Sequence, residues 1–227
     1  MKYPITFILF VSFIFNLHGQ DSTNMVKYSP DFKFNDGVYV NFEQVKANDP
    51  IPKSRLLTTV GYNDREFFER LTQNKEIAFY DRFGTQQSIP TKSIWGYSNN
   101  GVLYINLNNT FNRITVIGNI CHFVANQTTY YRDYYDPYYY GNPYYNRYGG
   151  YPYNTRKQSE LRQYVLDFES GEIYDYEIST MEILLMRDPE LHDEYANLRK
   201  KKKKQLKFYY LRKFNERNPL YIPSNNK

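Results

Sequence analysis

The stretch Lys92-Ser-Ile-Trp-Gly-Tyr-Ser-Asn-Asn-Gly-Val-Leu-Tyr-Ile-Asn-Leu-Asn108 determines the fold class of this chain. Asn99-Asn100-Gly101 is a hairpin turn signal, because Asn and Gly tolerate the positive φ angles of a two-residue turn. Along the strand that follows, apolar residues alternate with Tyr104 and Asn106, which is typical of a half-buried strand. The apolar positions are Leu103, Ile105 and Leu107. The stretch therefore predicts an antiparallel hairpin with one face in a core and the other toward solvent or a partner.

Similar short strands lie on both sides of this hairpin. Each is bounded by turn residues, and the segments between consecutive strands are short. Short connections of this kind join antiparallel neighbours. We expect strands at residues 37–42 (entering a helical turn over 43–46), 76–82, 86–90, 92–98, 102–108, 113–126, 162–168 and 172–177. The predicted fold class is α+β, with an antiparallel β-meander sheet, a long Tyr-rich loop and two C-terminal helices.

The two helices are expected within residues 179–217. Ser179 and Glu182 have the spacing of a capping box. Asp188-Pro189-Glu190 supplies an N-cap, a first-turn proline and an acidic first turn for a second helix that could run to about Asn215. Its acidic start and basic later turns agree with the helix dipole. Because its apolar stripe is interrupted at Lys202, we expect it to pack at both ends and to stand clear of the core in its middle.

Residues 129–157 have a different composition. Twelve of the 24 residues from Tyr130 to Tyr153 are Tyr, interleaved with Pro and Gly and with no Leu, Ile or Val. The pattern predicts a long low-complexity loop. It is either a tolerated surface insertion or a contact element, since Tyr provides stiff amphipathic area for docking to proteins or stacking on sugars. The candidate contact residues here are Tyr134, Tyr135, Tyr138, Tyr139, Tyr140, Tyr144 and Tyr145.

The N-terminus reads as a secretory signal peptide over residues 1–19. Lys2 precedes the apolar run Ile5 to Phe15, and Gly19 suits the cleavage position. No Cys lies near the cut, so we expect an exported protein that is not a lipoprotein. A polar lead-in (20–35), a β-rich domain (36–178), the helices (179–217) and a tail (218–227) would follow.

Six consecutive cations stand in the expected second helix. The segment Asp188–Arg217 holds ten Lys or Arg and five Asp or Glu, against 29 basic and 24 acidic residues in the whole chain. The run is either a solvated face or a contact with anionic headgroups or an acidic protein. Export disfavours nucleic acid as the partner. The candidate contact residues are Arg199, Lys200, Lys201, Lys202, Lys203 and Lys204.

Catalytic signals are weak. Cys121 and His122 could form a nucleophile and base, but neighbours in a strand point to opposite faces. Metal, phosphate-loop and dinucleotide motifs are missing from the sequence, so we expect no cofactor. The carboxylates Asp64, Asp81, Asp167 and Glu169 are scattered, and spacing nominates no catalytic pair among them.

Four segments carry a resemblance: Asp36–Glu43, Ser93–Tyr97, Asn100–Ile105 and Phe214–Tyr221. On them the chain resembles an uncharacterised family of exported Bacteroidota proteins, over most of the length beyond the signal but not the Tyr-rich segment. The resemblance implies a two-membrane envelope, with the periplasm or the inner side of the outer membrane as the location. It supplies no catalytic residues.

These observations lead to three functional hypotheses. The first is a non-catalytic exported envelope protein that binds other proteins or an envelope surface. The alternative is a glycan-binding module that uses Tyr side chains. The third is an enzyme whose site is assembled from scattered carboxylates.

Overall fold

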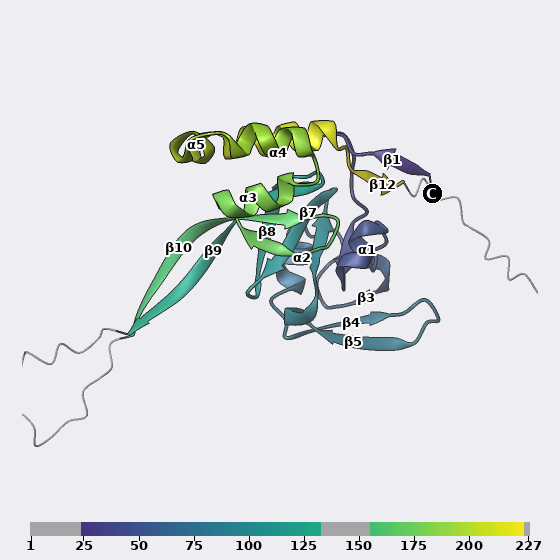
Figure 1. The fold of residues 1–227 in the computed structure, drawn as a ribbon. Coiled ribbons are helices and arrows are strands. Elements are labelled where there is room, and N and C mark those ends of the chain that lie inside the picture. The colour runs from purple at the N-terminus through teal and green to yellow at the C-terminus, as the bar shows by residue number, and fades with distance from the viewer. Residues whose placement is uncertain (1–23, 133–154, 225–227) are drawn as a thin grey trace, which may run out of the picture.

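The computed structural model describes residues 24–132 and 155–224, with the side chains of 128–132 and 155–158 excepted. The predicted signal peptide and the seven candidate tyrosines lie outside the described residues. The α+β class is confirmed (Figure 1). The strands are β1 (Met25–Lys27), β2 (Gly37–Tyr39), β3 (Leu56–Leu57), β4 (Glu76–Tyr80), β5 (Gln86–Pro90), β6 (Gly96–Asn99), β7 (Val102–Leu107), β8 (Thr110–Val116), β9 (Ile120–Arg132), β10 (Thr155–Asp167), β11 (Ile173–Asp175) and β12 (Tyr221–Pro223). The α-helices are α1 (Phe42–Lys46), α2 (Phe67–Leu71), α3 (Ile178–Leu185), α4 (Pro189–Ala196) and α5 (Lys200–Arg217), and Lys53–Arg55 and Thr91–Ser93 form short 3-10 turns.

The central element is a seven-stranded antiparallel sheet in the order β11-β10-β9-β8-β7-β6-β2. Strands β6 to β11 follow one another, so the predicted meander is confirmed. However, β4 and β5 are not part of it, because they pair with β3 in a separate three-stranded sheet. A third pair, β1 with β12, joins the two ends of the described chain. Most of the strands could be found from the sequence, but β1, β3 and β12 were missed, and the division of the strands among three sheets could not be predicted.

The hairpin that indicated the fold forms as predicted. Asn100 and Gly101 have φ angles of 54° and 78°, and the Gly101 N–H donates to Asp36 Oδ1 at 2.9 Å. Leu103 and Ile105 are fully buried. The opposite face is not free, because Tyr104 and its cross-strand neighbour Tyr97, whose rings stack with centroids 4.8 Å apart, pack in a core with α2 and β3–β5. The expected solvent or partner on that face is instead another part of the same chain.

Alternation along the strands places separate cores on the two faces of the sheet. One face carries a core formed with α1, β12 and the segment around Phe34. The other face carries two: α3, α4 and α5 cover the β9–β11 end, and α2 with β3–β5 covers the β2–β7 end. Side chains of Cys121 and Phe123 face the first core, whereas Ile120 and Val165 face the helices.

The single strand predicted over 113–126 is wrong. Gly118 lies in a turn that separates β8 from β9. A Cβ on Gly118 would stand 2.4 Å from the Asn215 side chain, so this turn allows close approach by the end of α5. The apolar residues on both sides of Gly118 concealed the break.

The expected C-terminal helices are present, but the single helix from Asp188 to about Asn215 is wrong. The chain turns back after α4, through Asn197 and an extended Arg199, and α5 then runs antiparallel to α4 (Figure 1). Folding back at the interrupted stripe lets the apolar residues of both halves pack on one sheet face. The capping box is also wrong, since α3 begins at Ile178 with Glu177 as its N-cap and no side-chain cap bond.

Strands β9 and β10 extend well beyond their neighbours. Their pairing begins with Ile120 opposite Asp167 and ends with Arg132 opposite Thr155. By comparison, β8 pairs with β9 only at His122 and Phe123. The two strands project from the sheet as a two-stranded ribbon (Figure 1). The prediction of loop for 129–132 and 155–157 is therefore wrong, because Tyr and Thr favour a strand even where aliphatic residues are missing.

Candidate functional site: the lysine end of the helical layer

The antiparallel pairing of α4 and α5 follows from local sequence signals. Asp188 caps α4 by accepting from the Leu191 N–H at 3.2 Å, with Pro189 in the first turn as predicted. Ion pairs then join the helices at matching levels, Glu194 with Lys213 at 2.5 Å and Glu190 with Arg217 at 2.7 Å. This geometry places the turn between the helices, and with it the cationic run, at one end of the layer.

The predicted agreement between the basic residues and the helix dipole is wrong as a result. Lys200 to Lys204 occupy the first turns of α5, where the dipole is positive, with no acidic residue in the first turn. The N-cap Arg199 makes no side-chain cap bond. Because the first N–H groups of a helix lack intrahelical acceptors, cations are unfavourable in this position and anions are favourable.

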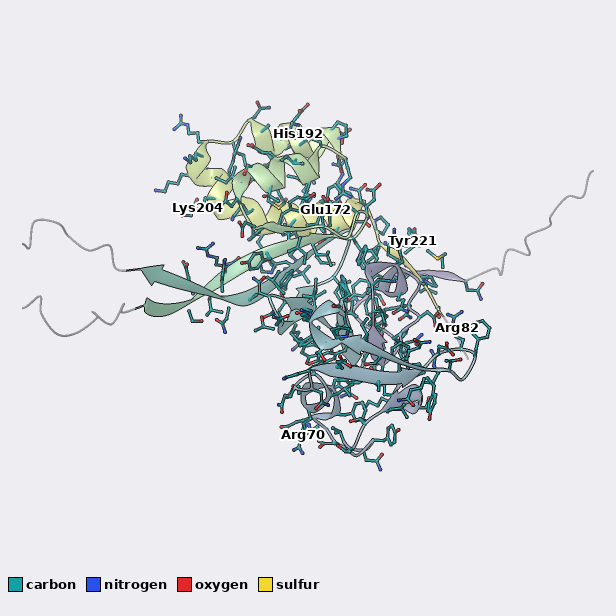
Figure 2. All side chains as sticks on the ribbon, turned by 90° about the horizontal axis from the view of Figure 1, so that it is seen from below. Arg70, Arg82, Glu172, His192, Lys204 and Tyr221 are labelled. Atoms are coloured by element: carbon teal, nitrogen blue, oxygen red, sulfur yellow. The ribbon has the colours of Figure 1, made fainter. Side chains whose placement is uncertain are left out.

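Five of the six candidate cations are exposed at this end. Lys203 differs, since it is half-buried and pairs with Glu182 at 2.6 Å. Lys204 lies at the end of the layer on the side from which β9 and β10 project (Figure 2). We call this region the lysine end. Its exposed cations are Arg199, Lys200, Lys201, Lys202 and Lys204.

A groove of about 620 Å³ lies between the first turns of α3 and α5. Four lysines and two glutamates line it, so its net charge is positive. We call it the lysine groove. Its lining residues are Tyr176, Glu177, Ile178, Ser179, Glu182, Lys200, Lys203, Lys204 and Lys207. Lys201 and Lys202 belong to the same run but do not line the groove.

Lys207 and Tyr176 form a tight contact in this groove. The Lys207 ammonium lies 4.0 Å from the centroid of the Tyr176 ring and donates to the Tyr176 carbonyl. Burial lowers the pKa of Lys207; Glu177 opposes this shift and Lys204 adds to it. Burial also raises the pKa of the Tyr176 hydroxyl, which is therefore a neutral donor. Among the described residues, this buried hydroxyl has no hydrogen-bond partner.

Next to the lysine groove, the sheet face beyond α5 is only partly covered. Leu161 of β10 is 71% exposed and Phe208 of α5 is 41% exposed. A second groove between them shares Tyr176, Lys204 and Lys207 with the first. Cationic and apolar surface are therefore adjacent at this end of the molecule.

Cys121 and His122 lie on opposite faces, as predicted. The Cys121 thiol is buried in the first core and donates to the Gly118 carbonyl, and burial raises its pKa to about 12. The His122 ring instead contacts Tyr176 and Phe208 under the helices. They therefore do not form a nucleophile and base pair.

The scattered carboxylates have separate structural contacts. Asp81 Oδ1 accepts from the N–H groups of Phe83 and Thr85 in the β4–β5 turn. Asp167 and Glu169 both pair with Arg187, at 2.9 and 2.8 Å, and Asp64 pairs with Arg70 at 3.2 Å. In the described ranges 24–132 and 155–224, no group of three or more His, Cys, Asp or Glu has metal-binding geometry. Nor does the described part contain a helix that is long and apolar enough to span a membrane.

The structure brings the candidate lysines together with residues that the sequence interpretation missed. Ser179, Glu182 and Tyr176 line the groove from elsewhere in the chain. The sequence singled out Ser179 and Glu182 only as a capping box, and no local pattern pointed to Tyr176. Lys207 could have been found, because Lys200, Lys203 or Lys204, and Lys207 have the spacing of one helix face.

Comparison with protein families matches residues 37–218 to a family of unknown function, DUF6563. The chain belongs to this family. The match covers the seven-stranded and three-stranded sheets, the helical layer and the lysine end, but not the β1–β12 pair. It agrees with the uncharacterised family expected from the sequence. Neither the search of curated proteins nor the search of solved structures found a match.

The segments that carried the resemblance have structural roles in this DUF6563 chain. Asn41 accepts from the Gln44 N–H at the start of α1, and Gly96 lets β6 approach the Tyr104 carbonyl. Asn215 binds the backbone at the β8–β9 turn. These residues explain the fold, and the lysine groove lies apart from them.

Proposed function

We propose that this protein is a non-catalytic exported protein of the bacterial envelope that binds an anionic envelope surface, or an acidic protein on it, through the lysine end. The signal peptide predicted over residues 1–19 supports export. The resemblance to exported Bacteroidota proteins favours the periplasm or the inner side of the outer membrane.

One observation carries the proposal: five exposed cations stand at the amino end of α5. Those in the first turn, Arg199 to Lys202, oppose the helix dipole, at a cost of roughly 0.3–1 kcal/mol each at low ionic strength. Fold stability therefore does not account for them. Close to an anionic membrane, each cation contributes about 1 kcal/mol of attraction, which exceeds or matches that cost.

The surroundings of the cations support a surface contact over chemistry. The Cys121 and His122 side chains are separated by the sheet, and the four carboxylates considered above are engaged in turns and ion pairs. Exposed Leu161 and Phe208 beside the lysine end add apolar area, which would strengthen contact with a lipid interface or a protein.

Flotation of the purified protein with vesicles tests the proposal. We expect binding to vesicles that contain phosphatidylglycerol, weaker binding at high salt because surface charges are screened, and little binding to neutral phosphatidylcholine. Replacing the five exposed cations with Gln should abolish binding. The matched control replaces five exposed cations elsewhere with Gln and should leave binding intact: Lys27, Lys33, Arg65, Lys75 and Lys92.

Equal loss in both variants would show that net charge alone attracts the protein, and would contradict a role for the lysine end. If the protein binds no vesicle, crosslinking in the native envelope tests whether the partner is an acidic protein. Capture of one partner that depends on the five cations would support that form of the proposal, and capture of glycan alone would overturn it.

A further inference from the structure

The lysine groove has features that a flat cationic surface does not need. It is an open groove, and its volume of about 620 Å³ lies within the roughly 300–1,000 Å³ typical of small-molecule sites. The first turns of two helices line it, and neither helix has a side-chain cap bond at its N-cap residue. Helix N-termini of this kind favour anions, because their N–H groups lack acceptors.

The side chains of the groove fit a tetrahedral oxyanion. Lys203 is held in place by Glu182 and Lys207 by the Tyr176 carbonyl, so these two ammonium groups are positioned in advance. Lys200 and Lys204 have no ion pair among the described residues, which leaves them able to close on a ligand. Ser179 lines the groove from the first turn of α3 and adds a hydroxyl donor.

Tyr176 positions one of these ammonium groups. The residue is 8% exposed and lines the groove, and Lys207 lies 4.0 Å from the centroid of its ring and donates to its carbonyl. The hydroxyl oxygen itself is buried and has almost no accessible surface, so the ring and the carbonyl of Tyr176 shape the groove and its hydroxyl does not.

We propose that the lysine groove binds a phosphate group, with Lys200, Lys203, Lys204 and Lys207 as cationic ligands and Ser179 as a hydroxyl donor. The inference rests on the proposed function in one respect, since a phospholipid headgroup is one source of the phosphate. A soluble phosphate ester is the other. The recognised chemistry is the same in both cases.

Calorimetry with glycerol 1-phosphate and inorganic phosphate tests the site on the full exported protein. We expect saturable binding of one phosphate per chain. Lys200→Gln with Lys204→Gln should weaken it by about tenfold or more, since each cation near a phosphate contributes on the order of 1 kcal/mol. The control, Lys201→Gln with Lys202→Gln, removes the same charge from the same turns outside the groove and should change affinity by less than about threefold.

Tyr176→Phe is a control for the packing of the groove. Because the hydroxyl makes no hydrogen bond with the described residues, its removal should leave the melting temperature unchanged or raise it. Because the hydroxyl is buried away from the groove, phosphate affinity should change by less than about threefold. A larger loss of affinity would contradict this assignment of the lysines as the ligands.

The outcomes distinguish this inference from the proposed function. Equal weakening in both lysine pairs, or no saturable phosphate binding, would overturn the groove site while vesicle binding could persist. Vesicle binding that is competed by glycerol 1-phosphate, and is lost in the Lys200/Lys204 variant alone, would identify the headgroup as the source. Phosphate binding without vesicle binding would identify a soluble ester and contradict contact with an anionic lipid surface.

Discussion

The side-chain amide of Asn215 forms two hydrogen bonds with the backbone of Ile120, a residue 95 positions earlier. Ile120 N–H donates to Asn215 Oδ1 at 2.9 Å, and Asn215 Nδ2 donates to the Ile120 carbonyl at 2.8 Å. Because Ile120 is fully buried, water does not replace these partners. The contact fixes the last turns of α5 to the β8–β9 turn.

Replacing Asn215 with Ala should destabilise the fold by about 2–4 kcal/mol, because two buried backbone groups lose their partners. Asn215→Asp keeps the acceptor and loses the donor, so we expect a smaller loss. Denaturant unfolding measures both. The control Asn126→Ala removes an amide from an exposed strand position and should change stability by less than about 0.5 kcal/mol. Equal midpoints for Asn215→Ala and the wild type would contradict the role of this contact.

Gly96 allows β6 to approach β7 closely. A Cβ at this position would stand 2.0 Å from the Tyr104 carbonyl oxygen, so Gly96→Ala should cost about 3 kcal/mol by forcing the strands apart. At Gly61, an added Cβ meets no atom within 4 Å. Gly61→Ala should therefore change the free energy of unfolding by less than about 1 kcal/mol. Similar losses in the two variants would contradict the steric argument.

Much of the sheet could be predicted from the sequence, because its information is local. The Asn100-Gly101 turn and the alternation after it lead directly to β6 and β7, and Asp188-Pro189 gives the start of α4. The division of 113–126 into two strands could not be predicted, since it depends on Asn215 at Gly118. The separation of β3–β5 from the main sheet likewise depends on packing between distant segments.

The candidate site could be predicted only in part. The six cations were evident, but their meaning depends on the turn between α4 and α5. A continuous helix would place them in later turns, where they agree with the dipole, whereas the observed helix places them at its amino end. Tyr176 and Ser179 complete the groove through tertiary packing, which no sequence spacing reveals.

The thiol of Cys121 should be unreactive in the folded protein. Burial raises its pKa to about 12, so the reactive thiolate is rare at neutral pH. We expect modification by Ellman's reagent only as fast as the protein unfolds, with the rate rising through the denaturant transition. Rapid modification of the native protein would show that the thiol is accessible, contrary to its position in the core.

Stability should decrease as the pH falls through the range in which His122 titrates. Burial lowers the pKa of His122 below the ordinary 6.5, and Lys207 adds to this while the hydrogen bond to Gln163 opposes it. The unfolded chain therefore binds a proton at a higher pH than the native state does. The contribution is fully present above about pH 6.5–7 and is lost below it.

His122→Gln should flatten this dependence. The test compares the melting temperatures of the wild type and His122→Gln between about pH 7.5 and 5. This interval lies above the range where most carboxylates titrate. His192→Gln is the control, since that residue lies on α4, away from the contact of His122 with Tyr176 and Phe208 (Figure 2), and should leave the profile unchanged. The same slope in wild type and His122→Gln would assign the acid sensitivity to other groups.

Reversing charge at the amino end of α5 should stabilise the fold and impair its proposed contact. Lys201→Glu with Lys202→Glu places anions at the positive end of the dipole, so we expect a gain of about 0.3–1 kcal/mol per residue at low salt. Lys201→Gln with Lys202→Gln should gain less stability, because it only removes the repulsion.

The Glu variant should also lose affinity for phosphatidylglycerol vesicles, because two exposed cations of the lysine end become anions. Opposite effects on stability and vesicle binding would mean that these lysines are retained against the preference of the helix. A loss of stability in the Glu variant would contradict the dipole argument and with it the reason for assigning these cations to binding.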